Sequence, residues 1–179
     1  ADKLNFKVEY TELEGAFPQD NEVLRVSAKN PHKDLFYYVA KKFDGLKANT
    51  QYSIATAFEL QSAILTDTAG SFSFELFFKM GASSVRPDTI LDINSSSSKY
   101  KLNLNKGENE TVGSDFVFLG KPDPNLKISK SSPKVIKNGD LTVTKTVETN
   151  SDGELWIVVG IDSKMPFEMA FSYNTIVVY

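Results

Sequence analysis

Four aromatic residues have the chemistry to bind a ligand through their rings: Tyr37, Tyr38, Tyr100 and Trp156. An aromatic face can stack on the C–H groups of a sugar ring. Tyr37 and Tyr38 are adjacent, so on a strand they point to opposite faces and one of them can lie on an open sheet surface. Core packing is the alternative for all four. Packing is favoured for all four, and most strongly for Trp156, which lies within the apolar run Leu155–Ile161.

Acidic residues suggest two other kinds of site. Glu59 and Glu75 occupy polar positions of two expected strands, and glycoside hydrolysis needs two carboxyl groups about 5–9.5 Å apart. Solvated strand residues are the simpler interpretation. Oxygen-rich turns could hold a structural calcium ion, the one cofactor that this pattern allows. Asp152 and Asp162 are the metal candidates, with Asp115 and Asp123 in similar turns, although no spacing matches an EF-hand loop.

Composition excludes several classes of function. The chain of 179 residues has no cysteine, so thiol nucleophiles and cysteine-ligated metals are ruled out. His32 is the single histidine, which excludes a metal site with two histidines. The sequence also contains no pattern that would place His32 in a catalytic triad. The net charge is −3 and the lysines are dispersed. The sequence therefore predicts no nucleic-acid partner.

The sequence also bears on location. No apolar run approaches the roughly 20 residues that span a bilayer, so no transmembrane segment is expected. The chain starts at Ala1 without a methionine or a signal sequence. The chain is therefore either a mature protein after signal removal or a shortened one. The Asn/Ser/Thr-rich surface, the aromatic strands and the absence of cysteine favour an exported bacterial protein that is periplasmic, cell-surface or secreted. Whether a signal peptide or lipid anchor preceded Ala1 stays open.

A two-residue alternation positions these side chains. In Tyr52–Leu60 and again in Phe72–Met80, large apolar residues alternate with small or polar ones, Lys79 among them, as on strands with one buried face. Similar runs separated by polar turns recur along the chain. The pattern predicts one domain over residues 1–179, all-β with little helix, built as an antiparallel two-sheet sandwich of the jelly-roll type. An up-and-down barrel is the main rival.

The expected strands cover residues 4–10, 23–28, 36–43, 51–60, 71–80, 100–104, 115–119, 141–147, 155–161 and 168–179. Segment 36–43 is apolar on both faces and is therefore expected in the centre of a sheet. The polar stretch 81–98 is expected to be mostly connection, with room for a short helix near 88–93.

Two parts of the chain resemble known extracellular β-sandwiches. Phe43–Ile54 contains Gly-Leu-Lys-Ala-Asn-Thr-Gln-Tyr, which resembles a turn-into-strand motif of fibronectin-type modules and of jelly-roll carbohydrate-binding modules. The resemblance implies that Leu46 plugs one end of the sandwich. It also implies that the Tyr52 hydroxyl bonds near this corner.

The second part combines Gly153–Ser163 with Phe171–Tyr179. It is similar to the last two strands of galactose-binding-like jelly rolls, and to a group of uncharacterised exported bacterial proteins and lipoproteins. Tyr173-Asn174-Thr175 lacks the aspartate that such endings often carry. This departure weakens the expectation of a calcium site there.

These observations lead to a functional hypothesis. The chain is predicted to be a non-catalytic exported binding module, with a carbohydrate or other extracytoplasmic glycan as its ligand. A protein-interaction or surface-assembly domain is the alternative, and a glycan hydrolase is a third. A flat apolar patch would favour a protein partner. A groove with exposed rings would favour a sugar, and two facing carboxylates, one with a raised pKa, would favour hydrolysis.

Overall fold

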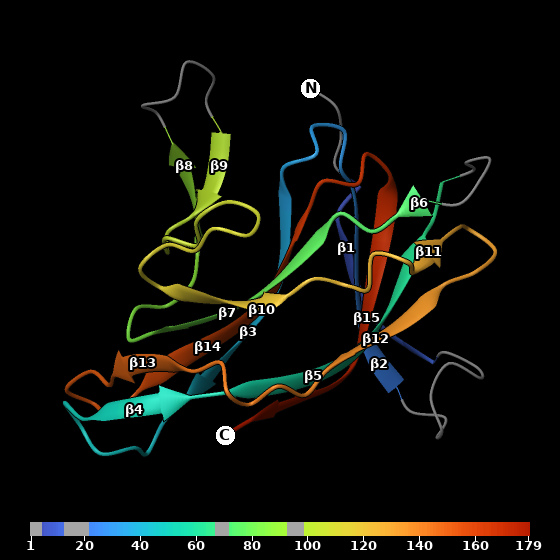
Figure 1. The fold of residues 1–179 in the computed structure, drawn as a ribbon. Helices are drawn as coiled ribbons and strands as arrows, with labels where there is room; N and C mark the ends of the chain where they lie inside the picture. Colours follow the sequence, from blue (N-terminus) through green and yellow to red (C-terminus); the bar gives the residue numbers. More distant parts are fainter. Residues whose placement is uncertain (1–4, 13–21, 67–71, 93–98) are drawn as a thin grey trace.

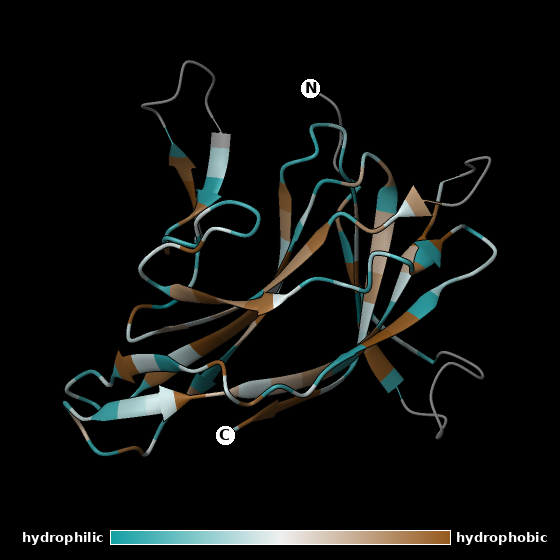
Figure 2. Cartoon of the chain, in the orientation of Figure 1, coloured by the Kyte–Doolittle hydropathy of each residue, from teal (hydrophilic) through white to brown (hydrophobic). Residues whose placement is uncertain are grey.

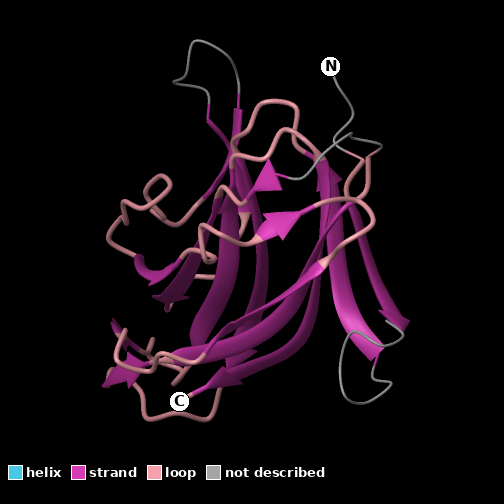
Figure 3. Cartoon of the chain, turned by 45° about the vertical axis from the view of Figure 1, so that its right-hand side comes forward, coloured by secondary structure: helices cyan, strands magenta, loops and turns pink. Residues whose placement is uncertain are grey.

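The computed structural model describes residues 5–12, 22–66, 72–92 and 99–179, and in this part of the chain every regular element is a β-strand. Two main sheets lie face to face (Figures 1 and 3). The first sheet has the order β1 (Lys7–Glu12), β2 (Glu22–Lys29), β15 (Glu168–Val178), β5 (Thr56–Ile64) and β12 (Lys134–Asn138). The second has the order β10 (Phe116–Gly120), β7 (Leu76–Ser83), β14 (Leu155–Ser163) and β3 (Leu35–Phe43).

Three short pairs complete the fold: β4 (Gln51–Ile54) with β13 (Lys145–Glu148), β6 (Phe72–Ser73) with β11 (Lys127–Ile128), and β8 (Thr89–Asp92) with β9 (Lys99–Leu102). Every strand pair is antiparallel. The predicted all-β, antiparallel architecture is therefore confirmed. Among the described residues there is no helix that could cross a membrane.

The core lies between the two sheets, and the predicted alternation produces it. Along β5, every second residue from Thr56 to Ile64 is buried. Figure 2 shows apolar and polar residues alternating along the strands. Rings from opposite sheets meet directly, since Phe58 of β5 lies 5.1 Å from Phe78 of β7 between ring centroids. Sheet-on-sheet packing of this kind buries the inward side chains and leaves the outer face of each sheet open to solvent or to covering loops.

The corner implied by the first resemblance is present. Leu46 packs against the core, and the Lys47 N–H donates to the Tyr52 hydroxyl at 3.2 Å. The Leu46 N–H donates to the carbonyl of Gly153 at 3.1 Å, so the segment after β3 is bonded to the turn before β14. The two segments that carry the resemblances therefore meet at one end of the sandwich.

Several details of the prediction are wrong. Segment 36–43 is not central: β3 is an edge strand that pairs only with β14 among the described strands. Its outer face is apolar because a later loop covers it. Residues 89–92 form β8 instead of a short helix, and β13 begins only at Lys145. The predicted strand start at residue 4 and the loops at 15–21, 67–70 and 94–98 lie outside the described residues.

Candidate functional site

The outer face of the four-stranded sheet brings together most of the chemically distinctive residues. The strand register aligns Tyr38 of β3, Gly160 of β14 and Lys79 of β7 in one row. The next row holds Phe36, Asp162 and Phe77. Side chains in such rows share a face, so Lys79 and Asp162 are diagonal neighbours on the side that points away from the core.

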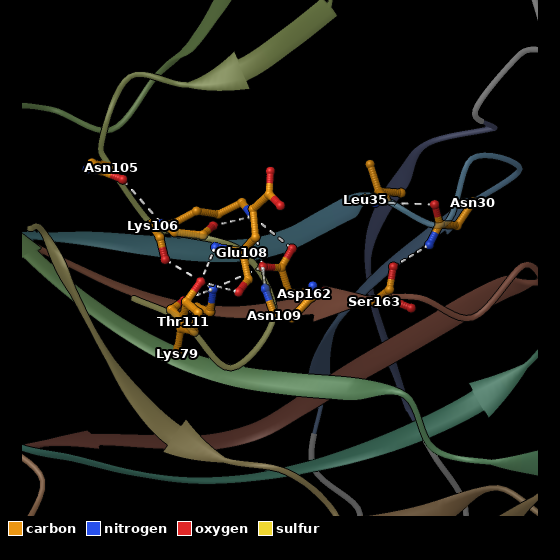
Figure 4. A network of polar contacts seen from close by, with 11 residues as sticks. Asn30, Leu35, Lys79, Asn105, Lys106, Glu108, Asn109, Thr111, Asp162 and Ser163 are labelled. Atoms are coloured by element: carbon orange, nitrogen blue, oxygen red, sulfur yellow. Dashed lines mark hydrogen bonds and ion pairs between the residues drawn. The ribbon is translucent and has the colours of Figure 1, made fainter. Parts of the chain in front are cut away.

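Lys79 and Asp162 form a buried ion pair on this face (Figure 4). The Lys79 Nζ lies 3.0 Å from the Asp162 Oδ2, and their side chains are 0% and 8% exposed. A second ammonium group, that of Lys106, lies 2.8 Å from the same oxygen and 2.9 Å from Oδ1. The Asn109 N–H also donates to Oδ2 at 3.2 Å. The carboxylate therefore holds the segment around residues 106–109 against the sheet.

The ammonium group of Lys79 has no donor left for a ligand. Besides Asp162, it donates to the carbonyls of Lys106 at 3.0 Å and Thr111 at 3.1 Å. These three bonds use all three N–H donors of a lysine. Burial lowers the pKa of Lys79 from its ordinary value, and the hydrogen bond and charge of Asp162 offset part of this effect. The cluster is built as a structural clamp.

A group of aromatic rings packs beside the clamp. Lys106 Nζ lies 5.1 Å from the centroid of the Phe36 ring, a cation–π distance. Phe36 stacks on Tyr38 at 5.8 Å and meets Phe116 edge-on at the same separation. A Cβ at position 160 would lie 2.1 Å from the Phe36 ring, so only glycine fits beside this ring. A second small apolar cluster thus forms outside the main core.

The four predicted stacking residues have different environments. Tyr37 is 2% exposed, its hydroxyl donates to the Ala28 carbonyl at 2.9 Å, and its ring packs edge-on against Phe171. Tyr38 is half-buried beside Phe36.

The other two rings lie toward solvent. Trp156 is half-buried, and the guanidinium of Arg86 lies 5.9 Å from its ring centroid. Tyr100 is 76% exposed on the β8–β9 hairpin, which projects from the body in Figure 1. Tyr100 is therefore the ring of the four that is freely accessible.

The structure separates the two carboxylates considered for hydrolysis. Glu59 belongs to β5 in the five-stranded sheet, whereas Glu75 immediately precedes β7 of the other sheet and is exposed. Glu59 forms an ion pair with Lys137 and accepts a hydrogen bond from Asn174 at 3.1 Å. These contacts lower the pKa of Glu59, with the Lys137 hydrogen bond the largest cause. A general acid for glycoside cleavage needs the opposite shift.

The metal candidates do not converge either. Asp152 lies in the turn before β14 and Asp162 near the end of that strand, where two lysines already neutralise it. Asp115 accepts the Asn105 N–H, and Asp123 accepts the Asn125 N–H. No group of three His, Asp or Glu side chains that could hold a metal is found in the described ranges.

One concave site lies at the side of the sandwich, where the edge strands β10 and β12 of the two sheets approach each other. The pocket has a volume of about 230 Å³. Apolar side chains form part of its lining: Phe78, Leu119, Leu126, Val135 and Ile136. Polar groups complete it: Lys121, Asp123, Lys137 and Asn138. The Asn138 Nδ2 donates to the Leu119 carbonyl at 2.7 Å and so bridges the two strands.

Sequence reasoning missed the clamp. The alternation assigns Lys79 to a solvated face, but the loop around residues 106–111 covers it. Two signals point to this burial. Phe77 and Gly81 share the face of Lys79, which is unusual for a solvated surface, and Asp162 directly follows the apolar run Leu155–Ile161 on the same strand. A buried charge of each sign on neighbouring strands suggests a pair.

No known family model matches the chain, and a search of curated proteins finds no match. The resemblance to galactose-binding-like jelly rolls therefore stays a prediction that rests on the two segments quoted above.

Proposed function

We propose that this chain is a non-catalytic binding module of jelly-roll type, exported from a bacterial cell, and that its ligand is a glycan. The pocket between β10 and β12 is the observation that carries this proposal. A sugar ring offers apolar C–H groups on its faces and hydroxyls at its edge. Lys121, Asp123 and Lys137 can bond to the hydroxyls. Leu126 and Val135, which keep exposed surface, can contact the C–H groups.

The volume of the pocket limits the size of the ligand. Its volume of about 230 Å³ is below the range of about 300–1,000 Å³ that is typical of sites for drug-sized molecules. One sugar residue suits this volume better than a longer chain. The rest of an oligosaccharide would extend into solvent past Lys121 and Lys137, both of which are exposed. Export is proposed from the resemblance and from the composition.

Glycan-array binding, repeated with calcium and with a chelator, tests the ligand class. The strongest binder would then be titrated calorimetrically against Lys121→Ala and Asp123→Ala. Both side chains are exposed on the rim, so these changes remove contacts without opening the core. Lys47→Ala is the matched control, because Lys47 is also an exposed lysine but does not line the pocket. Its backbone N–H, which bonds to the Tyr52 hydroxyl, is unchanged by the substitution. We expect weaker binding for the rim variants and unchanged binding for the control.

Two outcomes would contradict the proposal. Absence of binding to any glycan, with or without calcium, would remove the ligand class. Binding that survives both rim variants but disappears in Tyr100→Ala would move the site to the projecting hairpin, where Tyr100 pairs with Leu91.

A protein-interaction domain is the second candidate, and a specific observation favours it. Three large apolar side chains on or beside β1 are open to solvent: Phe6 is 66% exposed, Val8 52% and Tyr10 69%. An apolar stripe on a sheet edge is typical of a contact surface for another polypeptide.

A further inference from the structure

The apolar stripe on β1 is exposed because the two sheets differ in width. β1 is an edge of the five-stranded sheet, and Val8 and Tyr10 lie opposite Val26 and Leu24 of β2. Val26 belongs to the main core, so the stripe is on the inner face of the sheet. The four-stranded sheet ends at β3, whose Tyr37 bonds to Ala28 of β2. No described strand of that sheet therefore reaches over β1.

The opposite edge of the same sheet is covered. On β12 the inward residue Ile136 is only 7% exposed, against 69% for Tyr10, which lies in the same row of the sheet on β1. The β1 edge also has no strand beside it among the described elements, so its outward backbone N–H and C=O groups are available for pairing. An open edge with apolar side chains is suited to accept another strand.

The residues of this edge are self-complementary. The segment Phe6-Lys7-Val8-Glu9-Tyr10 is symmetric about Val8. An aromatic residue stands two positions away on each side, and residues of opposite charge stand next to Val8. In an antiparallel pair of two such strands centred on Val8, Phe6 of each copy lies opposite Tyr10 of the other. Lys7 of each copy lies opposite Glu9 of the other, so two ion pairs form. Unlike charges and aromatic residues opposite one another stabilise a sheet.

Neighbouring registers lack this match. Centring the pair on Lys7 or on Glu9 would place two like charges opposite each other, which is unfavourable. Within one chain the Lys7 Nζ already contacts the Glu9 Oε2 at 2.6 Å, with side-chain exposures of 63% and 32%. The two groups are thus on the same face, and both can exchange this contact for one across a strand pair.

We propose that two copies of this chain associate through β1, antiparallel and centred on Val8, so that their five-stranded sheets become one continuous sheet. The proposal extends the second candidate function and is independent of glycan binding. The contact is isologous and closed by a two-fold axis, so it produces a dimer without further growth. A pairing of so few residues is small, and interfaces below about 1,200 Å² are weak or transient. The dimer should therefore depend on concentration.

Sedimentation velocity on the full chain over a concentration series tests the association. We expect a shift from monomer to dimer as concentration rises. Val8→Lys should abolish the shift, because it brings two ammonium groups together on the two-fold axis. Val85→Lys is the matched control, since Val85 is 58% exposed elsewhere and its change should leave the dimer intact. Circular dichroism melts of both variants check that the fold is retained.

A charge exchange tests the register. Lys7→Glu alone and Glu9→Lys alone should each lose the dimer, because each brings like charges together. Mixing these two variants should restore association, as a heterodimer in which every charged pair is again of opposite sign. A folding defect cannot be rescued by mixing, so rescue would show that the loss comes from the charges. The register itself is reported by the single variants, since only a pair centred on Val8 places residue 7 opposite residue 9 and makes both changes disruptive. Because the chain has no cysteine, Val8→Cys adds one thiol per copy, and oxidation with added oxidised glutathione should link the two copies of the dimer through a disulfide.

A chain that stays monomeric at every concentration would overturn the proposal and leave a different protein as the partner of β1. A dimer that survives Val8→Lys would move the interface elsewhere. Failure of the mixed variants to associate would overturn the register. None of these results bears on glycan binding at the pocket, so the two proposals can fail separately.

Discussion

Two segments outside the main sheets are held against the sandwich by different chemistry. The segment around residues 106–111 is fastened by a buried carboxylate between two ammonium groups. The corner segment 45–50 is fastened by neutral hydrogen bonds. The Thr149 Oγ1 donates to the Lys47 carbonyl at 2.7 Å and accepts the Thr50 N–H at 3.1 Å, and the Asn49 N–H donates to the Asn150 carbonyl at 3.2 Å.

The two attachments should respond differently to the loss of a single side chain. Neutral hydrogen bonds contribute about 1 kcal/mol each, so removing one leaves the others nearly intact. A buried ion pair contributes little more than its apolar equivalent would. Losing one partner of it, however, leaves a charge without water or counter-ion, which costs far more. The corner should therefore weaken gradually, whereas the clamp should fail at a single substitution.

Asp162→Ala should have the largest effect. It leaves the ammonium group of Lys79, which is fully buried, without its anionic partner. We expect the free energy of unfolding to fall by about 3–5 kcal/mol, measured by urea denaturation. Asp152→Ala makes the same chemical change at an exposed position before β14 and should stay within about 0.5 kcal/mol of the parent chain. Equal losses in the two variants would contradict the clamp.

The double variant Lys79→Met with Asp162→Leu completes this test. It removes both buried charges and leaves Lys106, whose side chain is 21% exposed and can turn toward water. Since an apolar pair can replace a buried ion pair at little cost, the double variant should be more stable than Asp162→Ala alone.

Gly153→Ala should have the next largest effect, at the corner. The residue has φ +71°, and a Cβ there would lie 2.0 Å from the carbonyl oxygen of Leu46. Backbone strain of this kind costs about 1–3 kcal/mol. Thermal unfolding should show a lower Tm for Gly153→Ala. It should show no loss for Gly139→Ala, because no atom lies within 4 Å of a Cβ at that position. Similar melting of the two variants would argue against the close contact at this corner.

Thr149→Val should have the smallest effect. It keeps the shape of the side chain and removes a hydroxyl that bridges Lys47 and Thr50. We expect a loss of about 1–2 kcal/mol and faster hydrogen exchange at the Thr50 amide. Thr146→Val, at an exposed position of β13, is the control and should change neither quantity. A loss as large as that of Asp162→Ala would remove the distinction between the two attachments.

The sequence predicted the corner much better than it predicted the clamp. The turn within the corner segment involves residues close in the chain, such as Lys47 and Tyr52, and its chemistry is recognisable as a short motif. The hydrogen bonds that fasten this segment to Thr149 and Asn150 join distant parts of the chain and were not predicted. The clamp joins Lys79 to Asp162 across 83 positions. Alternation reports which side of a strand a residue occupies, but it does not report what covers that side.

The same limit explains the predicted site residues. Tyr37 and Tyr38 were expected on opposite faces, and they are. At these two positions both faces of β3 are packed, Tyr37 in the main core and Tyr38 in the second cluster with Phe36 and Phe116. The pocket between β10 and β12 also joins distant segments, so no local pattern in the chain could have indicated it.

The order of residues along the chain determined the strands, their two-residue periodicity and the local turn between Lys47 and Tyr52, because each arises from interactions between near neighbours. Only the tertiary structure decided that β3 lies at an edge, that Lys79 is buried and that the Phe6, Val8 and Tyr10 side chains are open to solvent. Burial depends on which distant segment lies above a side chain, and that is a property of the assembled sheets.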